Sequence, residues 1–350
     1  MAKNFKTDFQ EIHYAKRKPN FLLARVLSVG EFFYKSVINF KNFLYEINFS
    51  KEKTIGAQVI CVGNLTTGGV GKTPIVTALA NELSKTKKVA IISRGYGAKI
   101  SNKNPTIIKD YSGLKFSDGT LCADEPFQTA KKVNDGVVVI TCADRKKAAE
   151  FAIIKYGIDT IILDDGFSNR KLKKDKTIIV IDSKMRFGNN HLLPYGPLRE
   201  PISEIKRAQE IILVNKGDKN ITEAISWAKE KFNLPLKLSK MTPNRIYNMH
   251  SGANIKLNKE RAIAFCAIGQ PEQFFDFARE YYEITPVIFE DHHKYTKADI
   301  KELIKTAKEN NIKTFITTQK DETKLLELTK NVSDYSFNVL ELKTTIEEIN

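Results

Sequence analysis

The feature that most constrains the fold of this chain is the glycine-rich turn Gly-Gly-Val-Gly-Lys-Thr at 68–73, which lies between a short apolar run and a helical pattern. The apolar run, at 58–62, contains several β-branched residues, and apolar side chains recur with helical spacing over 75–83. Pro74 suits the first turn of that helix, where the missing N–H needs no partner. A strand, a turn of this composition and a helix, in this order, predict a phosphate-binding loop.

Each residue type in the turn has a chemical role in such a loop. Backbone N–H groups converge on phosphate oxygens, Lys72 reaches the β- and γ-phosphates, and the Thr73 hydroxyl can bind Mg²⁺. The strict pattern for these loops has a glycine where this chain has Thr66. We assign the following residues to the binding of the ATP phosphates: Thr66, Thr67, Gly68, Gly69, Val70, Gly71, Lys72 and Thr73.

A second motif places two acidic side chains at the end of a strand. The apolar run 160–163 is followed by Asp164 and Asp165, which is the form of a Walker B strand whose carboxylates hold Mg²⁺ near the phosphates. Either aspartate is a candidate for the direct ligand. Aspartate pairs also follow strands in ordinary turns and caps, but beside a phosphate loop this pair predicts a Mg²⁺ site.

From residue 57 onward, short β-rich runs alternate with helical patterns. We expect strands at 58–62, 89–93, 137–141, 160–163, 177–181 and 211–214, with helices over 75–83 and 146–156. This alternation is typical of an α/β fold in which helices cover both faces of a mainly parallel sheet, as in P-loop NTPases.

The length of 350 residues exceeds what one hydrophobic core usually organises. A largely polar stretch at 237–251 precedes a second set of expected strands, at 262–268, 286–289 and 314–317. We therefore expect a P-loop kinase domain at 51–240 and a smaller C-terminal α/β domain at 241–350 that closes the nucleotide cleft.

Residues 1–50 are expected to form an N-terminal amphipathic element built on a helix over 21–47. At about 100° per residue, a polar stripe runs along this helix and large apolar side chains cover most of the remaining circumference. The stripe consists of Arg25, Ser28, Glu31, Lys35, Asn39, Asn42 and Glu46. Only Lys41 breaks the apolar side. Such a helix can lie in a membrane interface with its polar stripe toward water, and the alternative is a helix packed on the protein's own core.

The charge balance narrows the class of partner. The chain has 56 Lys and Arg against 41 Asp and Glu, a net charge of +15, which favours nucleic acid, phospholipid headgroups or phosphorylated ligands. Because no aromatic-and-basic signature accompanies the charge, we expect no nucleic-acid partner. No obligate protein partner is evident. The four separated cysteines have neither disulfide nor zinc spacing, which indicates reduced thiols in a cytosolic setting.

Several further segments, taken together and in this order, resemble the tetraacyldisaccharide 4'-kinase (lipid A 4'-kinase) family. In the first expected domain they are Val-Gly-Asn-Leu-Thr at 62–66, Ser-Arg-Gly-Tyr-Gly at 93–97, Asp-Glu-Pro at 124–126, Asp-Asp-Gly-Phe at 164–167, and Leu-Pro-Tyr-Gly-Pro-Leu-Arg-Glu-Pro at 193–201. In the second they are 265–268, Asp-His-His at 291–293, and Thr-Gln-Lys-Asp at 318–321.

The resemblance implies transfer of the ATP γ-phosphate to the 4'-hydroxyl of tetraacyldisaccharide 1-phosphate, at the cytoplasmic face of a bacterial inner membrane. The implied partners are this lipid and an anionic membrane surface. It also implies that Asp124 is the base, paired with His292, with His293 as a neighbouring alternative. Without the resemblance, Asp124 would be interpreted as a helix N-cap.

The resemblance extends to further candidate residues. Glu125 is a candidate for a second Mg²⁺ contact, and Arg145 for a catalytic contact that stabilises phosphate charge. Arg94, Tyr96 and Arg199 are candidates for contacts to the substrate, although a surface cation would look the same in sequence.

The chain departs from the family at 168–169, where Ser-Asn replaces the usual Gln-His.

One rival hypothesis belongs to another class. The variant Gly-Gly-x-Gly-Lys-Thr also occurs in MinD- and ParA-like ATPases, which act as switches on membranes or DNA. Those proteins place a signature lysine directly before the paired glycines, whereas this chain has Thr67. The second domain and the segment 193–201 are not required by such switches, so we favour the kinase.

Overall fold

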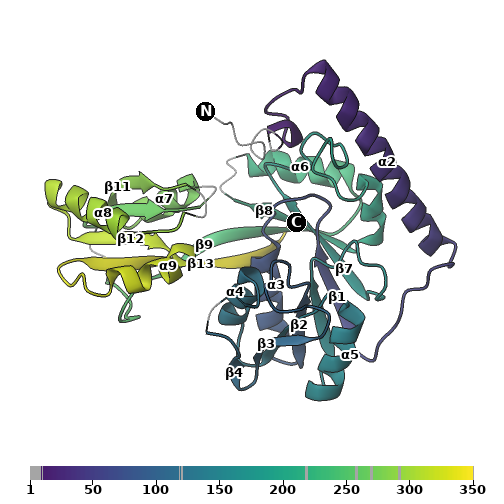
Figure 1. Cartoon of the computed structure of the whole chain (residues 1–350), viewed down its shortest axis with the longest axis horizontal. Helices are drawn as coiled ribbons and strands as arrows, with labels where there is room; N and C mark the ends of the chain where they lie inside the picture. Colours follow the sequence, from purple (N-terminus) through teal and green to yellow (C-terminus); the bar gives the residue numbers. More distant parts are fainter. Residues whose placement is uncertain are drawn as a thin grey trace. The chain divides into compact units, whose positions relative to one another are not determined.

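The computed structural model describes residues 9, 11–117, 119, 121–216, 220–256, 259–268, 271–290 and 293–349. The chain forms two compact units, Met1–Lys240 with Ile346–Asn350, and Met241–Thr345 (Figure 1). It passes from the first to the second within strand β9 (Leu236–Asn248) and returns within β13 (Ser336–Glu348). The polar stretch that was expected to separate two sets of strands is therefore mostly a strand itself.

The first unit contains a mainly parallel sheet with the order β4-β3-β5-β2-β6-β1-β7-β8-β9. Its parallel strands are β1 (Gln58–Gly63), β2 (Val89–Ser93), β5 (Val137–Thr141), β6 (Thr160–Asp164), β7 (Lys176–Asp182), β8 (Glu210–Asn215) and the start of β9. The antiparallel strands β3 (Thr106–Asp110) and β4 (Gly113–Leu114), which were not expected, extend one edge. All six strands predicted for this region are confirmed.

Helices cover both faces of this sheet, which confirms the predicted fold class. Successive residues of β1 point into opposite cores. Val59 and Cys61 pack with the alanines of α5 (Arg145–Tyr156) and α6 (Ile221–Lys231) on one face. Ile60 and Val62 pack with α3 (Lys72–Leu83) and α4 (Asp124–Lys132) on the other. Since both faces are covered, the central strands are continuously apolar. The connection from β1 to β2 runs to one side of β1 and the connection from β6 to β7 runs to the other, so the loops after β1 and β6 lie at a topological switch point.

The second unit repeats the α/β plan on a smaller scale. Its sheet has the order β11-β10-β12-β13-β9, with β11 at Glu283–Ile288, β10 at Arg261–Cys266 and β12 at Thr314–Thr318. Helix α7 (Pro271–Arg279) packs on one face, and α8 (Lys297–Glu309) with α9 (Gln319–Thr329) packs on the other. The three strands predicted for this region are confirmed.

Helix α2 (Phe21–Glu46) runs along the outside of the first unit (Figure 1). Polar side chains attach it: Glu31 accepts hydrogen bonds from His191 Nδ1 at 2.9 Å and from the Leu192 N–H at 2.7 Å. Lys41 Nζ and Asn42 Nδ2 each lie 3.1 Å from a carboxylate oxygen of Glu200. The expectation that the whole polar stripe faces water is therefore wrong, because two of its residues bond to the first unit. Glu31 binds His191, and Asn42 binds the fully buried Glu200.

The outward face of α2 and its C-cap is apolar. It carries large side chains that are each more than half exposed, namely Phe21, Leu22, Val26, Val29, Phe32, Phe33, Val37, Phe40, Phe43 and Ile47. We call these residues the apolar face of α2. Across the described residues, no helix combines the length and apolarity that crossing a bilayer requires.

The charge on Glu200 is stabilised where α2 meets the first unit. Burial alone would raise the pKa of this carboxyl, but Lys41, Asn42 and Arg207 together hold the pKa below its ordinary value. Arg207 Nη2 lies 3.3 Å from the Glu200 carboxylate, so two cations share the buried charge. Because a buried carboxylate is costly without such partners, this contact fixes where α2 lies.

Candidate active site

The phosphate loop joins β1 to α3 through two backbone conformations that favour glycine. Gly68 has a φ of +99° and Gly71 a φ of +93°, in a region that residues with a Cβ rarely adopt. At Gly71 a Cβ would also lie 3.1 Å from Val214 Cγ1. Helix α3 begins at Lys72, so Pro74 is its third residue and still falls in the first turn.

Thr66 occupies the position of the missing glycine because the backbone there is extended. It pairs with Leu198 in an antiparallel bridge, and the next N–H, from Thr67, donates to the Pro197 carbonyl at 2.7 Å. Asn64 Nδ2 donates to the Thr66 carbonyl at 2.7 Å. The segment 193–201 therefore holds the entry of the loop, and no positive φ is needed at Thr66.

Lys72 joins the loop to the aspartate pair. Its Nζ donates to Asn64 Oδ1 at 2.9 Å and lies 3.5 Å from Asp165 Oδ1. The Lys72 side chain is only 12% exposed, so the protein fixes the position of its charge. Asn64 was not assigned a role from the sequence, although it lies in the motif at 62–66 that carried the resemblance.

The two aspartates after β6 have opposite electrostatic environments. Burial raises the pKa of Asp164 to about 7 and outweighs the lowering effect of Lys72, and the charge on Asp165 adds a smaller increase. Burial also acts on Asp165, but Lys72 and Arg199 overcome it and hold the pKa of that carboxyl below its ordinary value. Arg199 Nη1 lies 2.9 Å from Asp165 Oδ2. Asp165 is thus a charged partner of two cations, whereas burial favours the neutral form of Asp164.

Close packing explains the glycines that flank this pair. A Cβ at Gly63 would lie 2.6 Å from Phe167 Cβ, and a Cβ at Gly166 would lie 2.8 Å from Leu163 Cβ. Arg207 lies 4.0 Å above the Phe167 ring and donates to the Phe167 carbonyl. The motifs at 62–66 and 164–167 therefore interlock directly behind the aspartates.

At the departure from the family pattern, both main-chain carbonyls accept hydrogen bonds, and the Asn169 side chain accepts one from the Lys171 N–H at 3.1 Å. The Ser168 carbonyl accepts from Lys41 Nζ at 3.4 Å, and the Asn169 carbonyl accepts from Lys174 Nζ. In the basic cluster that follows, Arg170 pairs with Glu52 at 3.2 Å.

Asp124 and Glu125 form the first turn of α4. The N-cap is Ala123, with an unusual φ of +77° and no side-chain cap, so the interpretation of Asp124 as an N-cap is wrong. A Cβ at Gly119 would lie 2.6 Å from Asp124 Oδ1. Glu125 lies close enough to Asp164 to contribute to its raised pKa. The structure thus brings Glu125 toward the aspartate pair.

Arg145 is the first residue of α5 and is 7% exposed. Its Nη1 donates to the Ala143 carbonyl at 3.0 Å, while its buried Nε has no hydrogen-bond partner among the described residues. Burial, and then Arg94, lower the pKa of its guanidinium, whereas Asp165 and Asp164 act in the opposite direction. A buried cation with an unused donor beside two carboxylates is suited to an anionic ligand.

Arg94 and Tyr96 lie in the loop after β2 and are exposed, Tyr96 at 88%.

His292 lies outside the described residues. Its neighbour His293, in the second unit, donates through Nε2 to Asp299 Oδ2 at 3.1 Å and stacks on Phe289.

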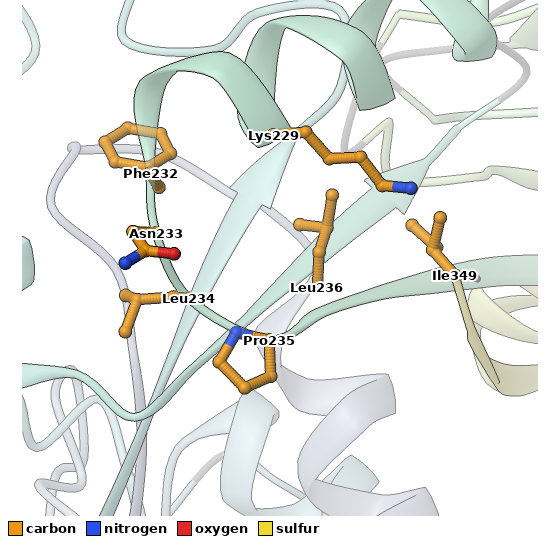
Figure 2. Close-up of a pocket in the computed structure, with 7 residues that line it drawn as sticks. All are labelled: Lys229, Phe232, Asn233, Leu234, Pro235, Leu236 and Ile349. Carbon is orange, nitrogen blue, oxygen red and sulfur yellow. The ribbon is translucent and has the colours of Figure 1, made fainter.

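A separate cavity of about 410 Å³ lies near the carboxyl end of α6. Its lining, drawn in Figure 2, consists of Lys229, Phe232, Asn233, Leu234, Pro235, Leu236 and Ile349. None of the predicted site residues belongs to it.

The parallel sheet, the phosphate loop after β1 and the paired aspartates after β6 define the P-loop nucleotide-binding class. Comparison with known proteins identifies the family. The family model described as Tetraacyldisaccharide-1-P 4'-kinase matches residues 23–349. The chain belongs to the tetraacyldisaccharide-1-P 4'-kinase family.

Individual relatives agree with this assignment. The Tetraacyldisaccharide 4'-kinase of Syntrophus aciditrophicus (strain SB) is 34% identical over 348 residues, covering 93% of this chain and 91% of that protein. That of Halothermothrix orenii is 33% identical over 318 residues, covering 85% and 82%. The crystal structure of the "apo" form of LpxK from Aquifex aeolicus in complex with ATP matches with a TM-score of 0.68 and 30% identity, over 93% of this chain and 95% of that one. The resemblance drawn from the motifs is confirmed, and the kinase prediction is favoured over the MinD- and ParA-like switch.

The raised pKa of Asp164 predicts a pH-dependent stability. Its folded-state pKa of about 7 exceeds the ordinary 3.8. Its contribution to the stability of the folded state is therefore complete below pH 3.8 and is lost as the pH rises through 7. Asp164→Asn keeps the shape without the charge. In EDTA at about pH 8 the free energy of unfolding of the variant should therefore exceed that of wild type by roughly 1–3 kcal/mol. This difference between the two proteins should shrink toward pH 4. Chemical denaturation at both pH values measures this, and an equal excess at both would contradict it.

Proposed function

We propose that the chain transfers the γ-phosphate of ATP to the 4'-hydroxyl of tetraacyldisaccharide 1-phosphate. The observation that carries this proposal is the position of Lys72, held between Asn64 and Asp165 in a chain of this kinase family. A relative of known structure was crystallised in complex with ATP, and named relatives are tetraacyldisaccharide 4'-kinases. The loop from Thr66 to Thr73 would hold the phosphate donor.

Phosphoryl transfer depends mainly on positioning and on stabilisation of charge at the phosphate oxygens. In this chain Lys72 and Arg145 supply partly or fully buried cations near the aspartate pair. Arg199 adds a third through its contact with Asp165. We assign Lys72 to the β- and γ-phosphates and Arg145 to the transferred group. Arg199, with Arg94 and Tyr96, is assigned to the substrate side of the site.

The donor set fits Mg²⁺. Among the described residues, no group of three or more His, Cys, Asp or Glu could hold a metal ion. Mg²⁺ does not require such a group, because it commonly takes one or two carboxylates together with substrate phosphates and water. Asp164, Asp165 and the Thr73 hydroxyl would hold it, with Glu125 as a further oxygen donor. When bound, Mg²⁺ would neutralise charge on the β- and γ-phosphates.

Asp124 is proposed as the base that accepts the proton of the attacking hydroxyl, with His292 as its partner. Two observations support a role in chemistry over a structural one. Asp124 is exposed in the first turn of α4 and is not its N-cap, and the preceding residue, Ala123, has a rare backbone conformation. Strained residues are often found beside functional groups, where the surrounding fold compensates for their cost.

The apolar face of α2 is proposed to lie in the cytoplasmic surface of the bacterial inner membrane. A continuous row of exposed Phe, Val and Leu side chains is unfavourable in water, and an acylated substrate must be collected from a bilayer. The net charge of +15 favours an anionic surface. The polar contacts of Glu31, Lys41 and Asn42 leave this apolar face turned away from the protein.

The reaction is tested with labelled ATP, Mg²⁺ and tetraacyldisaccharide 1-phosphate in detergent micelles. We expect label on the lipid, and we expect Asp124→Asn to lower kcat by at least about a hundredfold with little change in the Kd for ATP. ATP hydrolysis stimulated by DNA or bare vesicles, without labelled lipid, would refute the kinase. A variant that mainly weakens ATP binding would show that Asp124 contacts the nucleotide or the metal.

Membrane binding is tested by flotation with vesicles that contain or lack anionic lipid. Phe33→Asp combined with Phe40→Asp should weaken partitioning by about tenfold or more, since each change removes a large apolar side chain from the lipid-facing surface. Ile154→Asp on α5, where an apolar side chain is 85% exposed, is the matched control and should partition like wild type. Equal partitioning of all three proteins would exclude the apolar face of α2 as the membrane contact.

A further inference from the structure

Residues 11–17, which precede α2 and lie outside the part matched by the family model, pack against the entry of the phosphate loop. The Tyr14 hydroxyl donates to the Thr67 carbonyl at 3.2 Å. A Cβ at Gly68 would lie 3.3 Å from the same hydroxyl, so the phenol is in contact with the peptide that joins these two residues. Nothing in the reaction proposed above uses this contact.

The segment is fixed by specific packing. Ile12 is buried, and the His13 ring donates through Nε2 to the Pro194 carbonyl at 3.0 Å. Asn189 donates its N–H to the His13 carbonyl at 2.8 Å and its Nδ2 to the Ile12 carbonyl at 3.2 Å. Gly188 makes room for this docking, because a Cβ there would lie 2.3 Å from the His13 carbonyl oxygen. Tyr14 is therefore presented to the loop from an anchored backbone.

The contact has a geometric consequence for the loop. In a trans peptide the C=O of one residue and the N–H of the next point in opposite directions. A donor on the Thr67 carbonyl therefore turns the Gly68 N–H to the other side of the chain. The Thr67 N–H is already bound by the Pro197 carbonyl, so the peptide planes before and after Thr67 are both fixed.

A second carbonyl of the loop, that of Gly69, also accepts from a donor outside the loop. Lys216 Nζ bonds to the Gly69 carbonyl and pairs with Asp182 at 3.0 Å. A tyrosine hydroxyl is ordinarily protonated at neutral pH, and burial, and then Asp182, raise the pKa of Tyr14 further, so its hydroxyl is able to donate. Two donors from outside the loop thus hold the carbonyls of Thr67 and Gly69.

We infer that Tyr14 is a positioning residue that preorganises the phosphate loop for the triphosphate of ATP by fixing the peptide between Thr67 and Gly68. The inference rests on the proposed binding of ATP by this loop. Preorganisation acts on binding because a loop that is already ordered loses less freedom when the ligand arrives. Removal of the hydroxyl should therefore weaken ATP binding, with little effect on the chemical step or on the lipid substrate.

The test compares wild type, Tyr14→Phe and Tyr111→Phe in the full-length protein. Tyr111 is 47% exposed in the turn between β3 and β4, so Tyr111→Phe removes the same atom away from the loop. Calorimetry with Mg²⁺-ATP should show a Kd raised about two- to tenfold in Tyr14→Phe, the effect of one neutral hydrogen bond. The KM for ATP should rise in parallel, while kcat and the KM for the lipid stay within about twofold. Ile12→Ala, which loosens the anchor and keeps the phenol, should act in the same direction.

The outcomes separate the inference from the proposed function. An unchanged Kd in Tyr14→Phe, beside normal binding and transfer by wild type, would overturn the positioning role and leave the kinase intact. A loss of kcat and thermal stability with an unchanged Kd would show a purely structural contact and would also overturn it. If wild type itself fails to bind ATP, the proposed function falls, and the inference falls with it.

Discussion

The contact of Lys72 with Asn64 and Asp165 is the interaction on which the rest of the site depends. Lys72 begins α3, Asn64 follows β1, and Asp165 follows β6, so one ammonium group joins three elements at the carboxyl edge of the sheet. The parallel order of β6, β1 and β7 brings these loops to the same edge. Lys72 from the phosphate-binding turn and Arg199 from the segment 193–201 together keep Asp165 charged.

The segment 193–201 connects this centre to the N-terminal helix. The Arg199 side chain binds Asp165, and the Arg199 carbonyl accepts a hydrogen bond from Tyr34 of α2 at 2.9 Å. The next residue, Glu200, is buried against Lys41 and Asn42 of the same helix. Of these two adjacent residues, Arg199 thus contacts both Asp165 and α2, and Glu200 contacts α2. A helix proposed to lie on a membrane is therefore in direct contact with residues that shape the nucleotide site.

Much of the fold could be predicted because it depends on local patterns. The central strands are buried on both faces and appear as continuous apolar runs, and the phosphate loop follows a fixed order of residue types. Strands β3 and β4 were missed because few of their side chains are buried: β4 has only two residues, and two of the five residues of β3 are buried. The start of β9 was taken for a polar separator because its pairing with β8 buries only part of a polar sequence.

The contacts within the site were harder to predict, because they join residues far apart in the chain. Helical periodicity identified the stripe on α2, but the partner of Asn42 lies 158 residues away, so the sequence did not show that part of the polar stripe faces the protein. The roles of Asn64 and Tyr14 likewise depend on how loops meet. Thr66 seemed to weaken the phosphate-loop motif until its bridge with Leu198 showed an extended backbone that needs no glycine.

The most direct measurement is the affinity of the whole chain for Mg²⁺-ATP, determined by calorimetry for wild type, Lys72→Ala and Lys85→Ala. Lys85, 63% exposed just beyond the far end of α3, is the matched control. If the loop holds the triphosphate, Lys72→Ala should bind at least about tenfold more weakly, because a partly buried cation that contacts phosphate is lost, while Lys85→Ala should bind like wild type. Equal affinity in all three folded proteins would show that the triphosphate is not bound by Lys72 in this loop.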